Sequence, residues 1–240
     1  MGETTGQTSD HERALRELQR FLDAEFTATE IRTVLDAGCG YTLPVELPAG
    51  VRIVGLDTSA DALAKNDYID EAIVGDVETH LLPAEKFDVV LCWTVLEHVA
   101  DPGRAVSNMA AALRPGGLLV VGVPNFWSLK GLLTKFTPYS FHVWVYRRLW
   151  RSPDAGKPGF APFRTYLRRD IIPSRLALLA RRRDLERTYA ATYAYEYPLP
   201  RPLSSVWSVL ATLGRALSLG RWDPRASEHV AVFRKNAPSP

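Results

Sequence analysis

Short apolar runs alternate with helical patterns along the first half of the chain. Five of these runs consist mainly of aliphatic residues, as is typical of strands buried on both faces: residues 33–35, 52–56, 72–74, 87–91 and 118–123. Parallel strands need crossover connections, and the segments that begin at Ser59 and that span residues 101–113 have helical composition. The pattern predicts a doubly wound α/β sheet that is mostly parallel.

A covering helix is expected before the first strand. Ser9 or Asp10 can cap this helix, which extends to about residue 26. Its apolar residues recur at helical spacing: Leu15, Leu18 and Leu22. Further along, the glycines and proline of residues 114–117 are expected to separate the helix at residues 101–113 from the fifth strand.

The pattern changes beyond Pro124, where an aromatic and basic stretch interrupted by prolines extends to about residue 162. We interpret this stretch as a helical insertion or lid. The later runs predict a helix, a strand, a helix and a last strand that could close the sheet edge in antiparallel orientation: residues 172–183, 185–195, 203–219 and 229–234. The expected organisation is a core with its covering helix at residues 1–125, a lid or substrate-binding insertion at residues 126–163, and the C-terminal part of the same core at residues 164–240.

Charge is divided unevenly between the two halves of the chain. The 240 residues carry a formal net charge of +2, but residues 1–125 hold 9 Lys+Arg against 20 Asp+Glu, whereas residues 126–240 hold 20 against 7. Hydrophobic residues make up 46% of the chain and charged residues 23%, which argues against a disordered or fibrous protein. Cys39 and Cys92 lie far apart, so neither a disulfide scaffold nor zinc-ligand spacing is expected. No metal site is expected.

Candidate ligand-binding residues follow three consecutive predicted strands. They are Asp36, Gly38 and Gly40 after the first strand, Asp57 at the end of the second, and Asp76 with Val77 after the third. Open parallel sheets bind ligands at the carboxyl ends of their strands, where Asp57 could accept hydrogen bonds from both hydroxyls of a ribose. A nucleoside ligand is expected rather than a dinucleotide, because Leu43 occupies the position of the last glycine of a GxGxxG motif.

These motifs, over about residues 30–125, resemble the class I S-adenosylmethionine-dependent methyltransferases, which have a Rossmann-like fold. The resemblance implies that the loop of Asp36, Gly38 and Gly40 receives the methionine part of the cofactor. It also implies that Asp57 holds the ribose, and that Asp76 with Val77 contacts the adenine. Cys92 and Trp93, at the end of the fourth strand, are expected to border the cofactor.

Two features depart from the family pattern. Thr42 stands where a third glycine is common, and the first crossover is shorter than usual and contains Pro44 and Pro48. This crossover is therefore expected to be a loop.

Two histidines are candidates for a general base. An alcohol or phenol acceptor must lose a proton as it is methylated. His98, just past the fourth strand, is the first candidate and His142 is the second. The alternative for His98 is a structural, hydrogen-bonded histidine, because many members of the family carry Glu-His at this position.

The aromatic and basic stretch supplies the candidate acceptor-binding residues. These are Trp127, Tyr139, His142, Trp144 and Arg147. Aromatic faces with Arg and Lys suit a flat or apolar acceptor that bears a carboxylate or phosphate. The alternative is a packed helical pair with a solvated basic rim.

The predicted helix at residues 203–219 has one apolar face. Its members are Leu203, Val206, Trp207, Leu210, Leu213 and Leu217. Such a face on a sparsely charged helix is typical either of core packing or of contact with an anionic membrane.

The sequence favours O-methylation of a small-molecule or lipid-like acceptor, with S-adenosyl-L-methionine as the cofactor. Cys92, Trp93 and Thr94 occupy the place where enzymes that methylate amino groups usually carry an Asn/Asp-Pro-Pro-Tyr/Phe motif. The alternatives are a nucleic-acid or protein methyltransferase that uses the basic half, and a non-catalytic nucleoside- or membrane-binding member of the fold. A cytoplasmic location is expected, with peripheral membrane contact as an option, because the N-terminus is polar and no run of about 18 apolar residues occurs.

Overall fold

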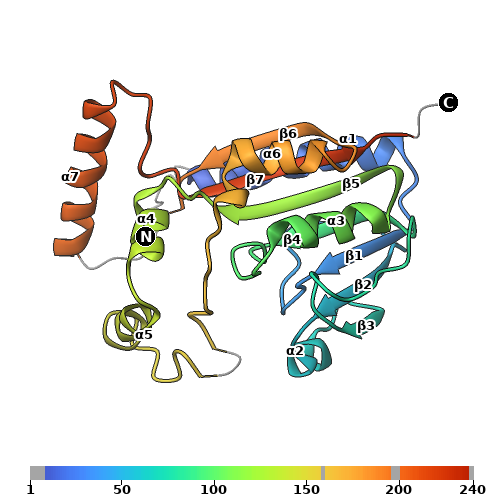
Figure 1. Cartoon of the computed structure of the whole chain (residues 1–240), viewed down its shortest axis with the longest axis horizontal. Helices are drawn as coiled ribbons and strands as arrows, with labels where there is room; N and C mark the ends of the chain where they lie inside the picture. Colours follow the sequence, from blue (N-terminus) through green and yellow to red (C-terminus); the bar gives the residue numbers. More distant parts are fainter. Residues whose placement is uncertain (1–8, 158–159, 196–200, 238–240) are drawn as a thin grey trace, which may run out of the picture.

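A seven-stranded mixed sheet forms the centre of the computed structural model, which describes residues 9–157, 160–195 and 201–237 (Figure 1). The strands are β1 Thr33–Ala37, β2 Arg52–Asp57, β3 Glu71–Val74, β4 Phe87–Trp93, β5 Leu113–Pro124, β6 Leu185–Tyr193 and β7 Glu228–Lys235. Their order is β3-β2-β1-β4-β5-β7-β6, and β1 to β5 pair in parallel. The prediction of a mostly parallel doubly wound sheet is confirmed.

Helices lie on both faces of the sheet. They are α1 Asp10–Ala28, α2 Ala60–Lys65, α3 Pro102–Ala112, α4 Leu129–Phe136, α5 Tyr139–Arg148, α6 Pro173–Arg181 and α7 Arg201–Leu217, with a 3₁₀ turn at Arg169–Ile171. Helices α3 and α6 pack on one face, where Val106, Met109 and Leu176 are buried against the strands. The strands in the middle of the sheet are therefore shielded from water on this side, as their continuous apolar sequences require.

Helix α1 covers the opposite face, as expected. Ser9 and Glu12 form a reciprocal capping box that fixes its first turn. Leu18 and Leu22 are fully buried in a cluster with residues of β1, β4 and β5. The helical spacing thus identified Leu18 and Leu22, whereas Leu15 is only half-buried and Ala14 is the third buried residue.

The crossover between β1 and β2 contains no helix, as predicted. Prolines at positions 44 and 48 prevent a regular helix here. Val45 is nevertheless buried in the same cluster as α1, with Leu43 and Leu47 packed around it. The loop therefore fills the space that a crossover helix would occupy on this face.

The edge of the sheet differs from the expectation in one respect. Antiparallel pairing is present, but the last strand, β7, lies between β5 and β6, so that β6 forms the edge. Val230, Val232 and Phe233 are buried, as is usual for a strand inside a sheet, and β7 pairs with β5 on one side and β6 on the other. Strand β6 has mostly exposed or half-buried side chains and tolerates the edge.

Residues 114–117 do not form the expected turn between helix and strand. Helix α3 ends at Ala112, and β5 starts at once with Leu113. The register against β4 shifts here, and Gly116 adopts a φ of +81°. The prolyl-glycyl run is therefore an irregularity within the strand.

Helices α4, α5 and α7 gather at one end of the molecule (Figure 1). Helix α4 starts just past β5, where Ser128 caps it and Gly131 packs on the backbone oxygen of Asn125. The chain then returns toward the sheet, and Tyr166 and Leu167 donate backbone hydrogen bonds to the carbonyl of Glu97 after β4. The insertion is thereby joined to the ends of β4 and β5.

Candidate functional site

The glycine loop after β1 folds back onto the end of β2. The backbone N–H of Gly38 donates to the carbonyl of Leu56 at 2.6 Å. Gly38 and Gly40 have φ angles of +80° and +50°, which side chains disfavour. Nothing lies within 4 Å of the position that a Cβ of Gly40 would take, so space is open beside the loop.

Asp57 is held at this loop by two backbone donors. Its Oδ2 accepts from the N–H of Gly40 at 3.1 Å, and its Oδ1 accepts from the N–H of Ser59 at 2.8 Å. Each carboxylate oxygen has a second lone pair that a ligand hydroxyl could use. The carboxylate is thus oriented before any ligand arrives.

Asp36 lies beneath the loop with 2% of its surface exposed. Burial raises the pKa of Asp36 to about 7, while the hydrogen bond from the Tyr68 hydroxyl opposes this rise. The Tyr68 oxygen lies 2.8 Å from both Asp36 Oδ2 and the carbonyl of Cys39. Tyr68 therefore connects β1 to the loop, and a cationic ligand nearby would favour the ionised form of Asp36.

Tyr68 and Asn66 were not singled out from the sequence. Asn66 donates to the carbonyl of Gly40 at 3.0 Å. Asn66 and Tyr68, which both follow α2, thus each contact a backbone carbonyl of the glycine loop. No spacing rule identifies them, because their contact with the loop depends on how α2 packs against the sheet.

Asp76 and Val77 form the turn after β3. Asp76 Oδ1 accepts from the backbone N–H of Glu78 at 2.8 Å. Among the described residues, neither Asp76 Oδ2 nor the N–H of Val77 makes a hydrogen bond. A carboxylate oxygen and a backbone donor are thus free side by side, which is the pair that an adenine edge would use.

Glu78 joins this turn to the loop after β4. Its two carboxylate oxygens accept from the backbone N–H groups of Ala100 and Asp101 at 2.9 and 2.8 Å. The ends of β3 and β4 are therefore fixed relative to one another.

Cys92 and Trp93 differ in their access to a ligand. Cys92 is fully buried, and burial raises the pKa of its thiol, so any ligand contact from Cys92 would have to come from its backbone. Trp93 is half-buried, and its ring covers Gly122 so closely that a Cβ there would lie 2.5 Å from the indole.

His98 has a defined tautomer. Its Nδ1 lies 2.8 Å from the carbonyl oxygen of Arg164, which can only accept, so Nδ1 carries the proton and Nε2 is unprotonated in the neutral ring. Burial lowers the pKa of His98, and the Arg164 carbonyl opposes this effect. The ring also meets Phe163 edge-on, with centroids 6.0 Å apart. His98 is therefore a neutral imidazole with a basic Nε2.

Glu97 is a buried carboxyl group next to His98. Burial raises the pKa of Glu97 to about 8, so it is protonated at neutral pH. Its Oε2 has no hydrogen-bond partner among the described residues, and its Oε1 lies 3.9 Å from His98 Nε2, too far for a hydrogen bond.

His142 is in a different position. Its Nε2 lies 2.6 Å from Thr137 Oγ1, whose single proton goes to the carbonyl of Leu133. Nε2 of His142 must then donate to Thr137, and this nitrogen is not available as a base. The two candidate bases have separate partners, and no contact joins them.

The predicted acceptor-binding residues are spread over α4 and α5. Tyr139, Trp144 and Arg147 line an open cavity of about 570 Å³ along α5. Trp127 is exposed near the start of α4, where its carbonyl accepts from Trp222 Nε1. The structure therefore brings three of the five together, and their role stays a prediction.

A comparison of two glycines tests the loop geometry. Replacing Gly38 with Ala should destabilise the protein by about 2–4 kcal/mol. The new Cβ would lie 2.2 Å from Val95 Cγ2, and the positive φ adds strain of about 1–2 kcal/mol. Gly40→Ala, with open space around it, should cost only the backbone strain. Urea unfolding of both variants measures the difference, and equal losses would contradict this packing.

Comparisons with known proteins show what this chain is similar to. A sequence model of a methyltransferase domain family matches residues 35–121, which include β1 to β5 up to Val121. The ubiquinone biosynthesis O-methyltransferase of Coxiella burnetii is 37% identical over 101 residues, covering 38% of this chain and 43% of the relative. The protein of the same name from Bradyrhizobium sp. is 37% identical over 100 residues, covering 38% and 40%. The chain spans less than half the length of these curated relatives.

Solved structures share the fold over nearly the whole chain. A SAM-dependent methyltransferase from Archaeoglobus fulgidus has a TM-score of 0.54 at 16% identity, covering 93% of this chain and 94% of that one. The cyclase SpnF has a TM-score of 0.55 at 17% identity, covering 98% and 86%. The sheet order and the matched domain agree, and the chain is similar to S-adenosylmethionine-dependent methyltransferases, in sequence over residues 35–121 and in fold over nearly its whole length.

Proposed function

We propose that this protein is an S-adenosylmethionine-dependent methyltransferase. The observation that carries the proposal is Asp57, whose carboxylate is oriented by Gly40 and Ser59 beside open space at the glycine loop. In this proposal Asp57 binds the ribose hydroxyls, and the loop at Gly38 and Gly40 receives the methionine part. Asp76 and Val77 would bind the adenine edge.

The cofactor, when bound, supplies a methyl group on a sulfonium that is already a good leaving group. The protein's own task is then to align an acceptor, exclude water and remove a proton from it. Structural relatives support this assignment of cofactor, because the N-methyltransferase NodS from Bradyrhizobium japonicum was solved with S-adenosylhomocysteine and has a TM-score of 0.50.

His98 is the proposed general base for a hydroxyl acceptor. Its pKa is lowered by burial, its Nδ1 proton is engaged by Arg164, and its Nε2 keeps a free lone pair. His142 is the second candidate; its Nε2 donates to Thr137, so Nδ1 is the nitrogen that could accept a proton. The protonated Glu97 carboxyl adds no negative charge that would raise the pKa of His98.

The proposed acceptor is a small or lipid-like molecule that is methylated at oxygen. The relatives named ubiquinone biosynthesis O-methyltransferase support oxygen loosely. Residues 126–163 are proposed to cover the acceptor, with the aromatic and basic side chains of α5 around the 570 Å³ cavity as contacts. Such a lining suits an apolar or aromatic acceptor with an anionic group.

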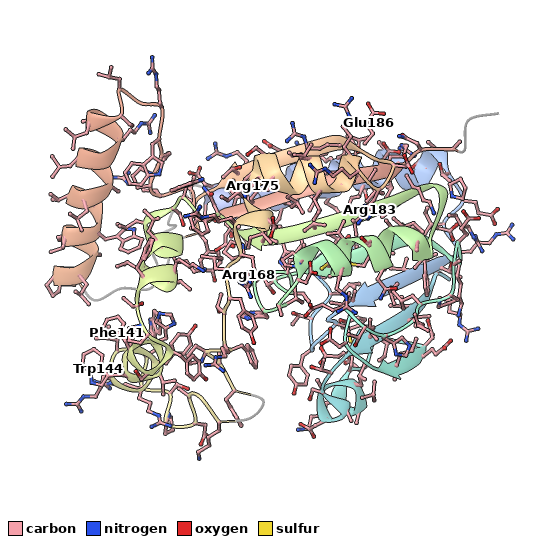
Figure 2. All side chains as sticks on the ribbon, viewed as in Figure 1. Phe141, Trp144, Arg168, Arg175, Arg183 and Glu186 are labelled. Atoms are coloured by element: carbon pink, nitrogen blue, oxygen red, sulfur yellow. The ribbon has the colours of Figure 1, made fainter. Side chains whose placement is uncertain are left out.

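One observation favours a second candidate, a nucleic-acid methyltransferase. Arg168, Arg175 and Arg183 spread along the face of α3 and α6 (Figure 2), although Arg183 donates to Ser107 and Arg168 to the carbonyl of Ala100. Binding to RNA that weakens steeply with salt would favour this candidate, and no RNA binding at low salt would remove it.

Calorimetry with S-adenosylhomocysteine is the first test of the proposed function. We expect binding at a single site, since the oriented carboxylate and the loop need no rearrangement. A panel of phenols, alcohols and amines with isotope-labelled S-adenosylmethionine, read by product mass, then identifies the acceptor class. Failure to bind either nucleoside would overturn the proposal, while binding without transfer to any acceptor would indicate a non-catalytic member of the fold.

A further inference from the structure

Helix α7 presents its apolar stripe outward. Its outward side chains recur every three or four residues and are 41–85% exposed: Leu203, Val206, Leu210, Leu213 and Leu217. Val209, which neighbours Val206 and Leu213 on the helix, is 57% exposed as well. A contiguous apolar surface of this kind marks an interaction site rather than an ordinary solvated helix face.

The face of α7 next to this stripe is the one that packs. Ala211 is buried, and a Cβ at Gly214 would lie 2.7 Å from the ring of Trp222 and 2.9 Å from Pro224. Arg225 donates to Thr212 Oγ1 at 3.1 Å and closes this contact. The small residues of α7 therefore face the protein, and its large aliphatic residues stay exposed beside them.

Exposed aromatic side chains also lie on α4 and α5. Phe136 is 76% exposed, and Phe141 stacks on Trp144 with ring centroids 5.9 Å apart. Figure 2 shows Phe141 and Trp144 at the same end of the molecule as α7. We call the exposed apolar residues of α4, α5 and α7 the apolar end.

The charge of the two segments that form the apolar end is entirely positive. Residues 126–153 contain five Lys or Arg and no Asp or Glu, and residues 201–222 contain three and none. Arg148 and Arg151 are exposed near the end of α5, and Arg221 is exposed just past α7. Aliphatic and aromatic residues with a basic rim are the composition of helices that lie in a membrane interface.

We propose that the apolar end docks on the surface of an anionic lipid bilayer, with α7 lying in the interface. None of the described helices has both the length and the apolarity of a transmembrane span, so the contact is one of surface insertion. A second copy of this chain fits the surface less well, because facing copies would bring the exposed cations Arg148, Arg151 and Arg221 of both copies together.

The docking surface does not depend on the proposed function. If the docking surface and the proposed function both hold, the lid proposed at residues 126–163 would contact the bilayer, where an apolar acceptor is concentrated. This last consequence rests on the proposed function. The surface itself rests on the exposed stripe of α7 and on the exposed arginines near it.

Co-sedimentation with vesicles tests the docking surface on the full chain. We expect binding to phosphatidylcholine vesicles that contain about one-third phosphatidylglycerol, at least about tenfold stronger than to phosphatidylcholine alone, and weaker at high salt. Leu210→Ser with Leu213→Ser should lower binding by at least about tenfold, because it removes the apolar contact. Arg148→Gln with Arg151→Gln should lower binding about fivefold for each charge.

Leu178→Ser on α6 is the matched control, because Leu178 is 51% exposed on a different face, and it should leave vesicle binding unchanged. Equal binding of the Leu210 and Leu213 variant and the wild type would overturn the proposal, as would no preference for anionic lipid. A concentration-dependent dimer that this variant abolishes, without vesicle binding, would assign the surface to a second copy instead. Calorimetry with S-adenosylhomocysteine on the same proteins tests the proposed function separately, since the proposed cofactor site does not include residues of α7.

Discussion

Replacing His98 with Asn should lower kcat on a hydroxyl acceptor by about 10²–10⁴-fold and leave the affinity for S-adenosylhomocysteine unchanged. The Asn amide can take over the Nδ1 donor to the Arg164 carbonyl, so the loop after β4 keeps its hydrogen bond. The substitution removes only Nε2, the nitrogen with the free lone pair. Steady-state kinetics with the acceptor found by the labelled-cofactor screen measure the loss.

The pH profile separates a base from a structural histidine. Burial lowers the pKa of His98, so the base is neutral at pH 7 and becomes protonated only at lower pH. Wild-type kcat should therefore fall on the acid side, below the ordinary pKa of histidine, and the His98→Asn variant should lose this dependence.

The variant His98→Gln shows which result would contradict the role of His98 as a base. His98→Gln places its amide near the Nε2 position and cannot reproduce the Nδ1 donor to Arg164, so it should lose both the base and the loop contact. If His98→Asn retains full activity while His98→Gln does not, His98 is a structural residue. If both variants keep full activity, the proton leaves the acceptor by another route.

Replacing Asp57 with Asn should weaken S-adenosylhomocysteine binding by about 100-fold or more. Hydrogen bonds to a charged group are worth about 1.5–3 kcal/mol each, and the carboxylate is proposed to accept two from the ribose. Asn offers one oxygen, and its NH₂ would face one of the two backbone donors that now orient Asp57. Isothermal titration calorimetry measures the change directly, without an acceptor.

Asp61→Asn is the matched control for this change of charge. Asp61 is an exposed carboxylate in the first turn of α2, four residues from Asp57, and it pairs with Lys65 at 2.7 Å. Its loss should leave binding of S-adenosylhomocysteine within about twofold of the wild type, because a surface ion pair of this kind contributes little. A similar loss in both variants would mean that the acidic field of the first half, and not the Asp57 carboxylate, attracts the ligand.

The local pattern of apolar residues was sufficient to predict most strands of the parallel sheet. The apolar runs at β1, β2 and β4 are buried on both faces, so their sequences carry a strong signal of their position. Ser9 and Asp101 cap their helices as such residues do in isolated segments, which made the starts of α1 and α3 predictable.

Other features depended on contacts between distant parts of the chain. The position of β7 inside the sheet follows from pairing with both β5 and β6, which no local pattern specifies. Tyr68 reaches Asp36 across 32 residues of sequence, and the tautomer of His98 depends on a carbonyl 66 residues away. The side-chain burial of Cys92 likewise became clear only from the packed core.

The sequence by itself determined the order of the strand-end residues Asp36, Asp57 and Asp76, because each follows a short apolar run. The prediction that all these runs are buried on both faces is wrong for β3, which lies at the sheet edge with half-buried and exposed side chains. The sequence left the apolar stripe of α7 undecided between core and surface, since a helical period shows which residues share a face and not what that face meets. Tertiary packing decided this point: the small residues Ala211 and Gly214 allow close approach to Trp222 and Pro224, and this contact turns the large aliphatic side chains outward.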